Sequence, residues 1–178
     1  MAGINHADVK AAGDKGYANE WNKDHNITGD VDFDGFNITN LADPEACKVK
    51  RSANKTLANA AMTIIDFNQE EFDTDGMHDN AVANTRITII KDGFYLVFGR
   101  GGFDVSAVGN RGIGFRLNSE TFFGGIIVLS TGGATIAICS DVVYLTAGSY
   151  VEFYASQTSG GDLDLLATDT NFGVIKIR

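Results

Sequence analysis

The chain has 178 residues, of which 44% are hydrophobic, so it is long enough for one packed core and an extension. Its net charge of −9 argues against nucleic-acid binding, because an acidic surface repels phosphate backbones. No apolar run reaches the ~20 residues that span a bilayer, and the first six residues lack a signal-peptide pattern. We therefore expect synthesis in a cytoplasm without a secretory signal and without membrane insertion.

The first 60 residues are polar and differ from the rest, so we expect two parts, 1–60 and 61–178. Apolar and polar residues alternate over residues 26–41, but the apolar ones are too few for a core within one chain. Such a segment is either disordered or shared between copies around a common axis, and the alternation favours the shared form. Pro44 ends the pattern, and residues 45–61 read as a polar connector that can be partly helical.

From Met62 onward the chain shows strand and turn patterns, rich in Gly, aromatic and β-branched residues. Strands are predicted over 62–67, 85–90, 94–98, 112–117, 122–129, 134–145, 150–155 and 163–177, the last interrupted near Asp169. The absence of an internal sequence repeat disfavours a propeller or a β-helix. The pattern predicts an all-β domain, a β-sandwich or jelly roll.

The predicted strand at residues 94–98 is apolar on both faces. Phe94, Leu96 and Phe98 share one face, and Tyr95 and Val97 share the other. A strand of this kind lies either between two packed layers or under a partner chain.

Three segments resemble the globular heads of the tumour necrosis factor and complement superfamily: Asp92 to Phe98, Tyr144 to Glu152 and Phe172 to Ile177. The segment from Ile65 to Gly76 resembles that family's opening strand and loop. The resemblance covers roughly residues 62–178 and implies a ten-strand jelly roll that forms a homotrimer about a three-fold axis. It implies that Phe98, Ile138 and Asn171 pack about this axis. The family often has tyrosine in place of Asn171, so a polar or solvated contact is expected there.

Residues 29–44 resemble a segment of the trimeric fibre shafts of tailed bacteriophages, which precedes a receptor-binding tip. The two resemblances together imply a short intertwined shaft and a homotrimeric head. They predict a phage tail fibre or receptor-binding protein that is located in the virion tail and contacts other tail proteins. Its head is expected to attach to a host cell-surface receptor, and carbohydrate is one class of receptor. Two alternatives remain open: a trimerisation or capping module without its own receptor, and a secreted complement- or cytokine-like binding protein.

Two acidic loops are candidates for Ca²⁺. Asp73, Asp75 and Asp79 can surround a hard cation, and the complement-head resemblance implies calcium near the trimer top. The favoured alternative is a solvated turn whose side chains hydrogen-bond their own backbone. The segment from Asp30 to Gly35 copies half of a calcium loop, but its twelfth position is Leu41 rather than glutamate. No other cofactor is expected.

No catalytic motif stands out. Gly109 to Gly114 lacks the Lys-Ser/Thr ending of a phosphate loop, the three histidines show no metal spacing, and no Gly-x-Ser-x-Gly turn occurs. Cys47 and Cys139 lie far apart, and Cys139 stands in an apolar run typical of a buried thiol. We therefore predict a binding protein rather than an enzyme, with the loops at 156–162 and 118–121 as candidate receptor contacts.

Overall fold

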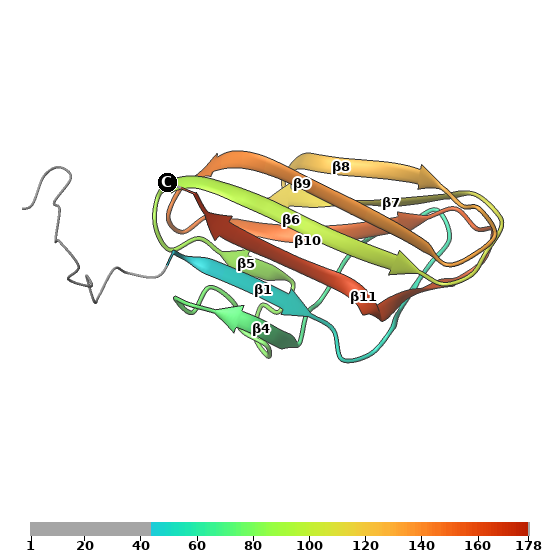
Figure 1. Ribbon diagram of the computed structural model, residues 1–178, viewed down its shortest axis with the longest axis horizontal. Helices are drawn as coiled ribbons and strands as arrows, with labels where there is room; N and C mark the ends of the chain where they lie inside the picture. The colour runs from blue at the N-terminus through green and yellow to red at the C-terminus, as the bar shows by residue number, and fades with distance from the viewer. Residues whose placement is uncertain (1–43, 178) are drawn as a thin grey trace, which may run out of the picture. The chain divides into compact units, whose positions relative to one another are not determined.

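The computed structural model describes residues 44–177, drawn in colour in Figure 1. The predictions for the shaft segment at 29–43 and for the calcium loop at Asp30–Gly35 lie outside these residues. In the part of the chain that is described, no helix is long and apolar enough to cross a membrane.

The described chain consists of strands joined by turns and contains no helix. The strands are β1 (Ala46–Lys50), β2 (Lys55–Leu57), β3 (Met62–Ile64), β4 (Gln69–Asp73), β5 (Arg86–Thr88), β6 (Gly93–Phe103), β7 (Asn110–Leu117), β8 (Thr121–Leu129), β9 (Thr135–Leu145), β10 (Tyr150–Gln157) and β11 (Leu163–Lys176). The all-β prediction is confirmed for residues 44–177, although eleven strands form where ten were expected.

The strands form two sheets that pack face to face (Figure 1). The front sheet has the order β4-β1-β11-β6-β9, with β2 beside β11. The back sheet has the order β3-β10-β7-β8, with β5 beside β10. The strand pairings are antiparallel, and several neighbours in the sheets are distant in sequence, which gives the crossed connections of a jelly roll.

Aromatic rings fill the space between the sheets. Phe67, Phe115, Phe153 and Phe172 are fully buried and pack against one another with ring centroids 5.8–6.1 Å apart. Gly99 of β6 faces them, because a Cβ there would lie 2.5 Å from the ring of Phe153. Glycine thus lets the two layers approach closely at the middle of the core.

The prediction of a partly helical connector at residues 45–61 is wrong in one respect, because this segment contains strands and no helix. β1 pairs along its whole length with β11, and β2 pairs with the start of β11. Cys47, Val49 and Leu57 are fully buried. The sequence of this segment looks polar because the lysines of β1 alternate with buried residues. This alternation is typical of a strand with one buried and one solvent-exposed face. β1 and β2 therefore belong to the same two-sheet fold as the strands after residue 61.

The interruption expected near Asp169 is a local irregularity within a continuous strand. β11 runs from Leu163 to Lys176, and its register against β6 shifts between Leu166 and Asn171. The bulge changes how β11 meets its neighbour without ending the strand.

Candidate interaction surface

The outward face of the front sheet carries a cluster of exposed apolar side chains. The largest are Phe94, Ile136, Ile138, Val142, Tyr144 and Ile177, each between 46% and 65% exposed. We call this cluster the front apolar face. Large apolar groups gathered on one sheet face of a protein with a complete core indicate an interaction surface.

Strand register gathers these residues from distant parts of the chain. Tyr144 lies opposite Phe94, with their ring centroids 5.3 Å apart in an edge-to-face arrangement. In the next row Val142 lies opposite Leu96, which lies opposite Ile175 on β11. Paired residues of an antiparallel sheet point to the same side, so the three neighbouring strands β11, β6 and β9 share one apolar surface.

Phe98, Ile138 and Asn171 come together on this same face. Ile138 of β9 pairs with Arg100 of β6, and Arg100 pairs with Asn171 of β11, so the three residues form one row across the sheet. Phe98 precedes Arg100 by two residues and lies in the adjacent row. Ile138 is 65% exposed, whereas Phe98 and Asn171 are partly buried by their neighbours on the sheet.

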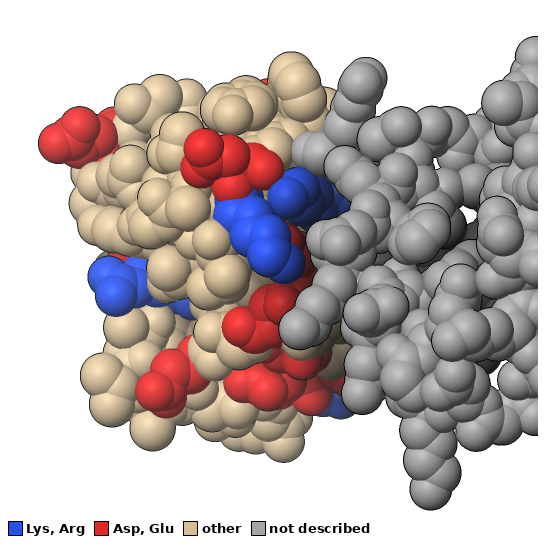
Figure 2. Space-filling model, turned by 90° about the vertical axis from the view of Figure 1, so that its left-hand side faces the viewer, with Lys and Arg blue, Asp and Glu red and all other residues tan. Residues whose placement is uncertain are grey.

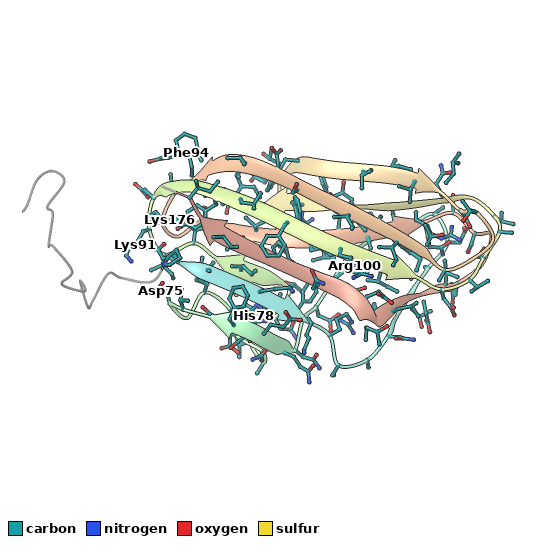
Figure 3. All side chains as sticks on the ribbon, in the orientation of Figure 1. Asp75, His78, Lys91, Phe94, Arg100 and Lys176 are labelled. Carbon is teal, nitrogen blue, oxygen red and sulfur yellow. The ribbon has the colours of Figure 1, made fainter. Side chains whose placement is uncertain are left out.

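Arg100 gives this face a charge that the sequence reasoning missed. Its Nη2 lies 2.6 Å from Asp169 Oδ1, an ion pair that joins β6 to the bulge of β11 (Figure 3 labels Arg100). The two-residue alternation of β6 continues from Phe98 to Arg100, so the sequence contained the signal. The same alternation along β9 would have added Val142 and Tyr144 to Ile138.

A second apolar group lies on the outermost strands of the two sheets. Ile126, Ile127 and Leu129 of β8 are 39%, 73% and 75% exposed. β8 and β9 each end their sheet, and a shallow hollow between them is lined by Gly124, Ile126, Ile138 and Ser140, among others. We call this strip, β8 with the adjoining part of β9, the apolar edge.

A buried carboxylate fixes the start of β1 to the head. Glu45 is 4% exposed; Tyr95 Oη donates to its Oε2 at 2.6 Å, and Lys91 Nζ lies 2.6 Å from its Oε1. Burial acts to raise the pKa of Glu45, but the hydrogen bonds from Lys91 and Tyr95 and the charge of Lys176 outweigh it and lower the pKa. Figure 2 looks at this end of the sandwich and shows basic and acidic side chains next to one another. Glu45 thereby anchors the chain where it enters the sheet.

The three aspartates proposed for calcium do not converge on one point. Asp73 accepts hydrogen bonds from the backbone N–H groups of Asp75, Met77 and His78, and Asp79 accepts from those of Ala81 and Val82. Over residues 44–177, no group of three or more His, Cys, Asp or Glu side chains is arranged to hold a metal ion. The geometry is that of turns whose carboxylates cap their own backbone, and it does not support the calcium site.

The two candidate receptor loops lie at opposite ends of β10. Tyr150, at the start of β10, bonds to Asn118 in the β7–β8 turn, whereas Thr158, just after its end, bonds to Asn110. Only the 158–162 loop therefore lies at the end remote from Pro44, which we call the far end. The loops at 104–109 and 130–134 also lie there, linked by the bond from Ser130 N to Gly109 O.

A buried arginine organises the far end. Arg111 is fully buried, and its guanidinium donates to the carbonyl oxygens of Ser106, Val108 and Asn110 at 3.0–3.2 Å. These three bonds hold the 104–109 loop, which exposes 57% of Val108. The sequence showed only that Gly109 to Gly114 is not a phosphate loop, and it did not reveal that Arg111 holds the 104–109 loop in place.

Comparison with known proteins identifies the fold. No family model matches the sequence, and no curated protein sequence matches it. A crystal structure of murine APRIL at pH 5.0 covers 76% of this chain and 100% of its own, with a TM-score of 0.59 and 11% identity. The structure of Eiger TNF from S. frugiperda covers 76% of this chain and 93% of its own, with a TM-score of 0.57 and 12% identity. A second murine APRIL structure, at pH 8.0, has a TM-score of 0.55 and 13% identity over 76% and 100% of the two chains. The described residues therefore have the jelly-roll fold of tumour necrosis factor domains.

Proposed function

We propose that this chain is a homotrimeric binding head that attaches to a cell-surface receptor. The observation that carries the proposal is the front apolar face, whose six large side chains are each about half exposed in one copy. Burial of apolar surface stabilises association by about 25 cal/mol per Å² before the costs of ordering are subtracted. We propose that a second copy of the chain buries this surface in the assembly.

Apolar groups that face in two directions favour a ring over a two-fold dimer. The front apolar face lies on the flat of one sheet, and the apolar edge adjoins it along β9 and continues onto β8 of the other sheet. If the edge of one copy packs on the face of the next, the contact is heterologous, and contacts of this kind form a closed ring when the rotation between copies closes. Phe98, Ile138 and Asn171 remain our proposed axis-facing residues, with Arg100 added to their row.

The finer identity that we propose is the receptor-binding tip of a phage tail fibre, located in the virion tail. It is supported by the shaft-like segment at 29–44 and by the position of Pro44 at one end of the sandwich. The exposed loops and hollows of the head then supply the contacts with the host surface. Three equivalent sites give avidity, which compensates for weak single-site affinity. This role is one of binding rather than catalysis.

A second candidate is a secreted ligand of the tumour necrosis factor type. It is favoured by the fold likeness, which includes a structure named as a TNF. The two candidates share the trimeric head and the receptor, and they differ in what carries the head and which surface it meets.

Light scattering coupled to size-exclusion chromatography tests the trimer. A mass of three chains is expected, since one chain weighs 19.0 kDa. A monodisperse monomer at micromolar concentration would refute the proposal. Fluorescently labelled protein then separates the candidates, because a fibre tip should label bacteria and a cytokine-like ligand should label animal cells. Failure to label either kind of cell would leave the capping module as the better description.

A further inference from the structure

One arginine of the described chain lacks the partner that the others have. Four arginines have their guanidinium groups engaged: Arg51 by Asp66, Arg100 by Asp169, Arg116 by Glu152, and Arg111 by loop carbonyls. Within residues 44–177, the side chain of Arg86 makes no hydrogen bond and no ion pair. Its Nε is shielded from solvent without an acceptor, as are those of Arg100 and Arg111, but in Arg86 the terminal nitrogens are without a partner as well. A cation in this state is short of one anionic partner.

The side chain of Arg86 is held in place although it is unpaired. Its guanidinium carbon lies 4.7 Å from the centre of the Tyr150 ring, which is a cation–π contact. Arg86 also lies opposite Glu152 in the sheet, but Arg116 and Ser119 bond to the Glu152 carboxylate at 2.9 and 3.1 Å. The stacked guanidinium is therefore pre-oriented, and its cross-strand carboxylate is already engaged.

Arg86 lines a surface hollow of about 410 Å³. Its other walls include Gly76, His78, Asp79 and Thr88. The ring of His78 bonds to the carbonyl oxygens of Arg86 and Phe67, at 2.9 and 3.1 Å, and so fixes the β4–β5 segment against β5 (Figure 3 labels His78). Hollows of a few hundred Å³ accept small molecules or single sugar units, whereas protein interfaces bury about 800 Å² on each partner.

We propose that this hollow binds an acidic sugar of the receptor glycan, with its carboxylate or phosphate group on Arg86. The planar guanidinium presents parallel N–H donors that fit both oxyanions. The inference rests on the proposed attachment function and names the class of receptor at this site. Arg86 belongs to the back sheet, so the front apolar face stays free for assembly.

Asp79 sets the selectivity of the hollow. It is exposed, and the backbone N–H groups of Val82 and Ala81 lower its pKa, so it stays charged at neutral pH. Its negative charge repels any anion in the hollow, so only an anionic group that is well oriented on Arg86 binds there. Asp79→Asn keeps the acceptor oxygen that caps the turn and removes the repulsion. This variant is therefore expected to bind the acidic sugar several-fold more tightly.

Titration of the 178-residue protein with defined sugars, monitored by saturation-transfer NMR and calorimetry, tests the site. The probes are glucuronic acid, glucose 6-phosphate, glucose, acetate and inorganic phosphate. We expect at least one acidic sugar to bind ten-fold or more tightly than glucose and than the free anions. The two acidic sugars distinguish carboxylate from phosphate as the recognised group. Equal binding of glucose, or of the free anions, would overturn the inference.

Matched variants locate the binding. Arg86→Gln should reduce affinity at least ten-fold, and Tyr150→Leu should reduce it by removing the ring under the guanidinium, whereas Tyr150→Phe retains that ring. Lys50→Gln is the control, because the side chain of Lys50 also makes no ion pair within residues 44–177 but lines a different hollow. Unchanged binding by Arg86→Gln would refute the assignment. Oligomeric state and cell labelling are read separately, so a failed sugar site is distinguishable from a failed attachment function.

Discussion

The ring of Phe98 lies over Gly173 on the neighbouring strand of the front sheet. The two residues pair in register, and a Cβ added at Gly173 would lie 2.5 Å from Phe98 Cζ and 2.7 Å from the carbonyl oxygen of Cys47. Glycine is therefore required at this position for the Phe98 ring to lie flat on the sheet. This contact explains why Phe98 is partly buried although it points out of the core.

Gly173→Ala is expected to lower the free energy of unfolding by about 1–3 kcal/mol, because the added methyl group meets both a ring and a backbone atom. Urea unfolding followed by circular dichroism measures this change. Gly161→Ala is the matched control, since a Cβ at Gly161 meets nothing within 4 Å. Equal stability of the two variants would show that Phe98 does not occupy the position described.

Val142→Asp is expected to convert the proposed trimer into monomers without unfolding the head. Val142 is 54% exposed in one copy and lies in the middle of the front apolar face, so the charge is tolerated by the monomer and buried only in the assembly. Light scattering measures the mass, and circular dichroism checks the fold. Val82→Asp is the control, because Val82 is 70% exposed but lies outside this face. A trimer that survives Val142→Asp would move the interface elsewhere.

The strand period in the sequence was enough to predict which residues of β6 share a face. Phe94, Leu96 and Phe98 lie together on the outer face, and Tyr95 and Val97 lie in the core, so the predicted division into two faces is confirmed. A period of two specifies faces but not partners. The front apolar face therefore emerged only when register placed β9 and β11 beside β6.

Contacts between distant segments explain what the sequence did not reveal. β1 lies inside the front sheet because it pairs with β11, more than a hundred residues later, and no local pattern encodes that partner. The stacking of Arg86 on Tyr150 arises in the same way, since β5 pairs with β10. Interactions between near neighbours were easier to predict. The sequence favoured turns in which Asp73 and Asp79 accept hydrogen bonds from nearby backbone N–H groups, and the structure contains these bonds.

Asp66 should make stability depend on pH in the acid range. Burial would raise its pKa, but hydrogen bonds from Arg51 and Lys55 lower it from 3.8 to about 2. A lowered folded-state pKa means that the stabilisation is complete above the unfolded value of 3.8 and is lost as the pH falls towards 2. Asp66→Asn should therefore lower the free energy of unfolding by ~1 kcal/mol at neutral pH.

The difference between the native protein and Asp66→Asn should shrink as urea unfolding is repeated at lower pH, and should disappear as the pH falls through the folded-state pKa. Asp162→Asn is the control, since Asp162 is exposed and its side chain makes no hydrogen bond or ion pair within the described residues. A difference that stays constant from neutral to acid pH would mean that the ion pairs of Asp66 do not contribute.

The two thiols should be unreactive in the folded protein. Cys47 is fully buried and Cys139 is 7% exposed; burial raises the pKa of both, that of Cys139 to about 12. Because the thiolate is the reactive form, a disulfide reagent at pH 8 should label neither thiol in native protein and both in guanidinium chloride. Cys139 lies between Ile138 and Ser140 on the strand that bears the front apolar face. Over longer times, labelling of Cys139 should therefore be faster in Val142→Asp than in the unaltered protein, and equal rates would count against burial of β9 by a partner copy.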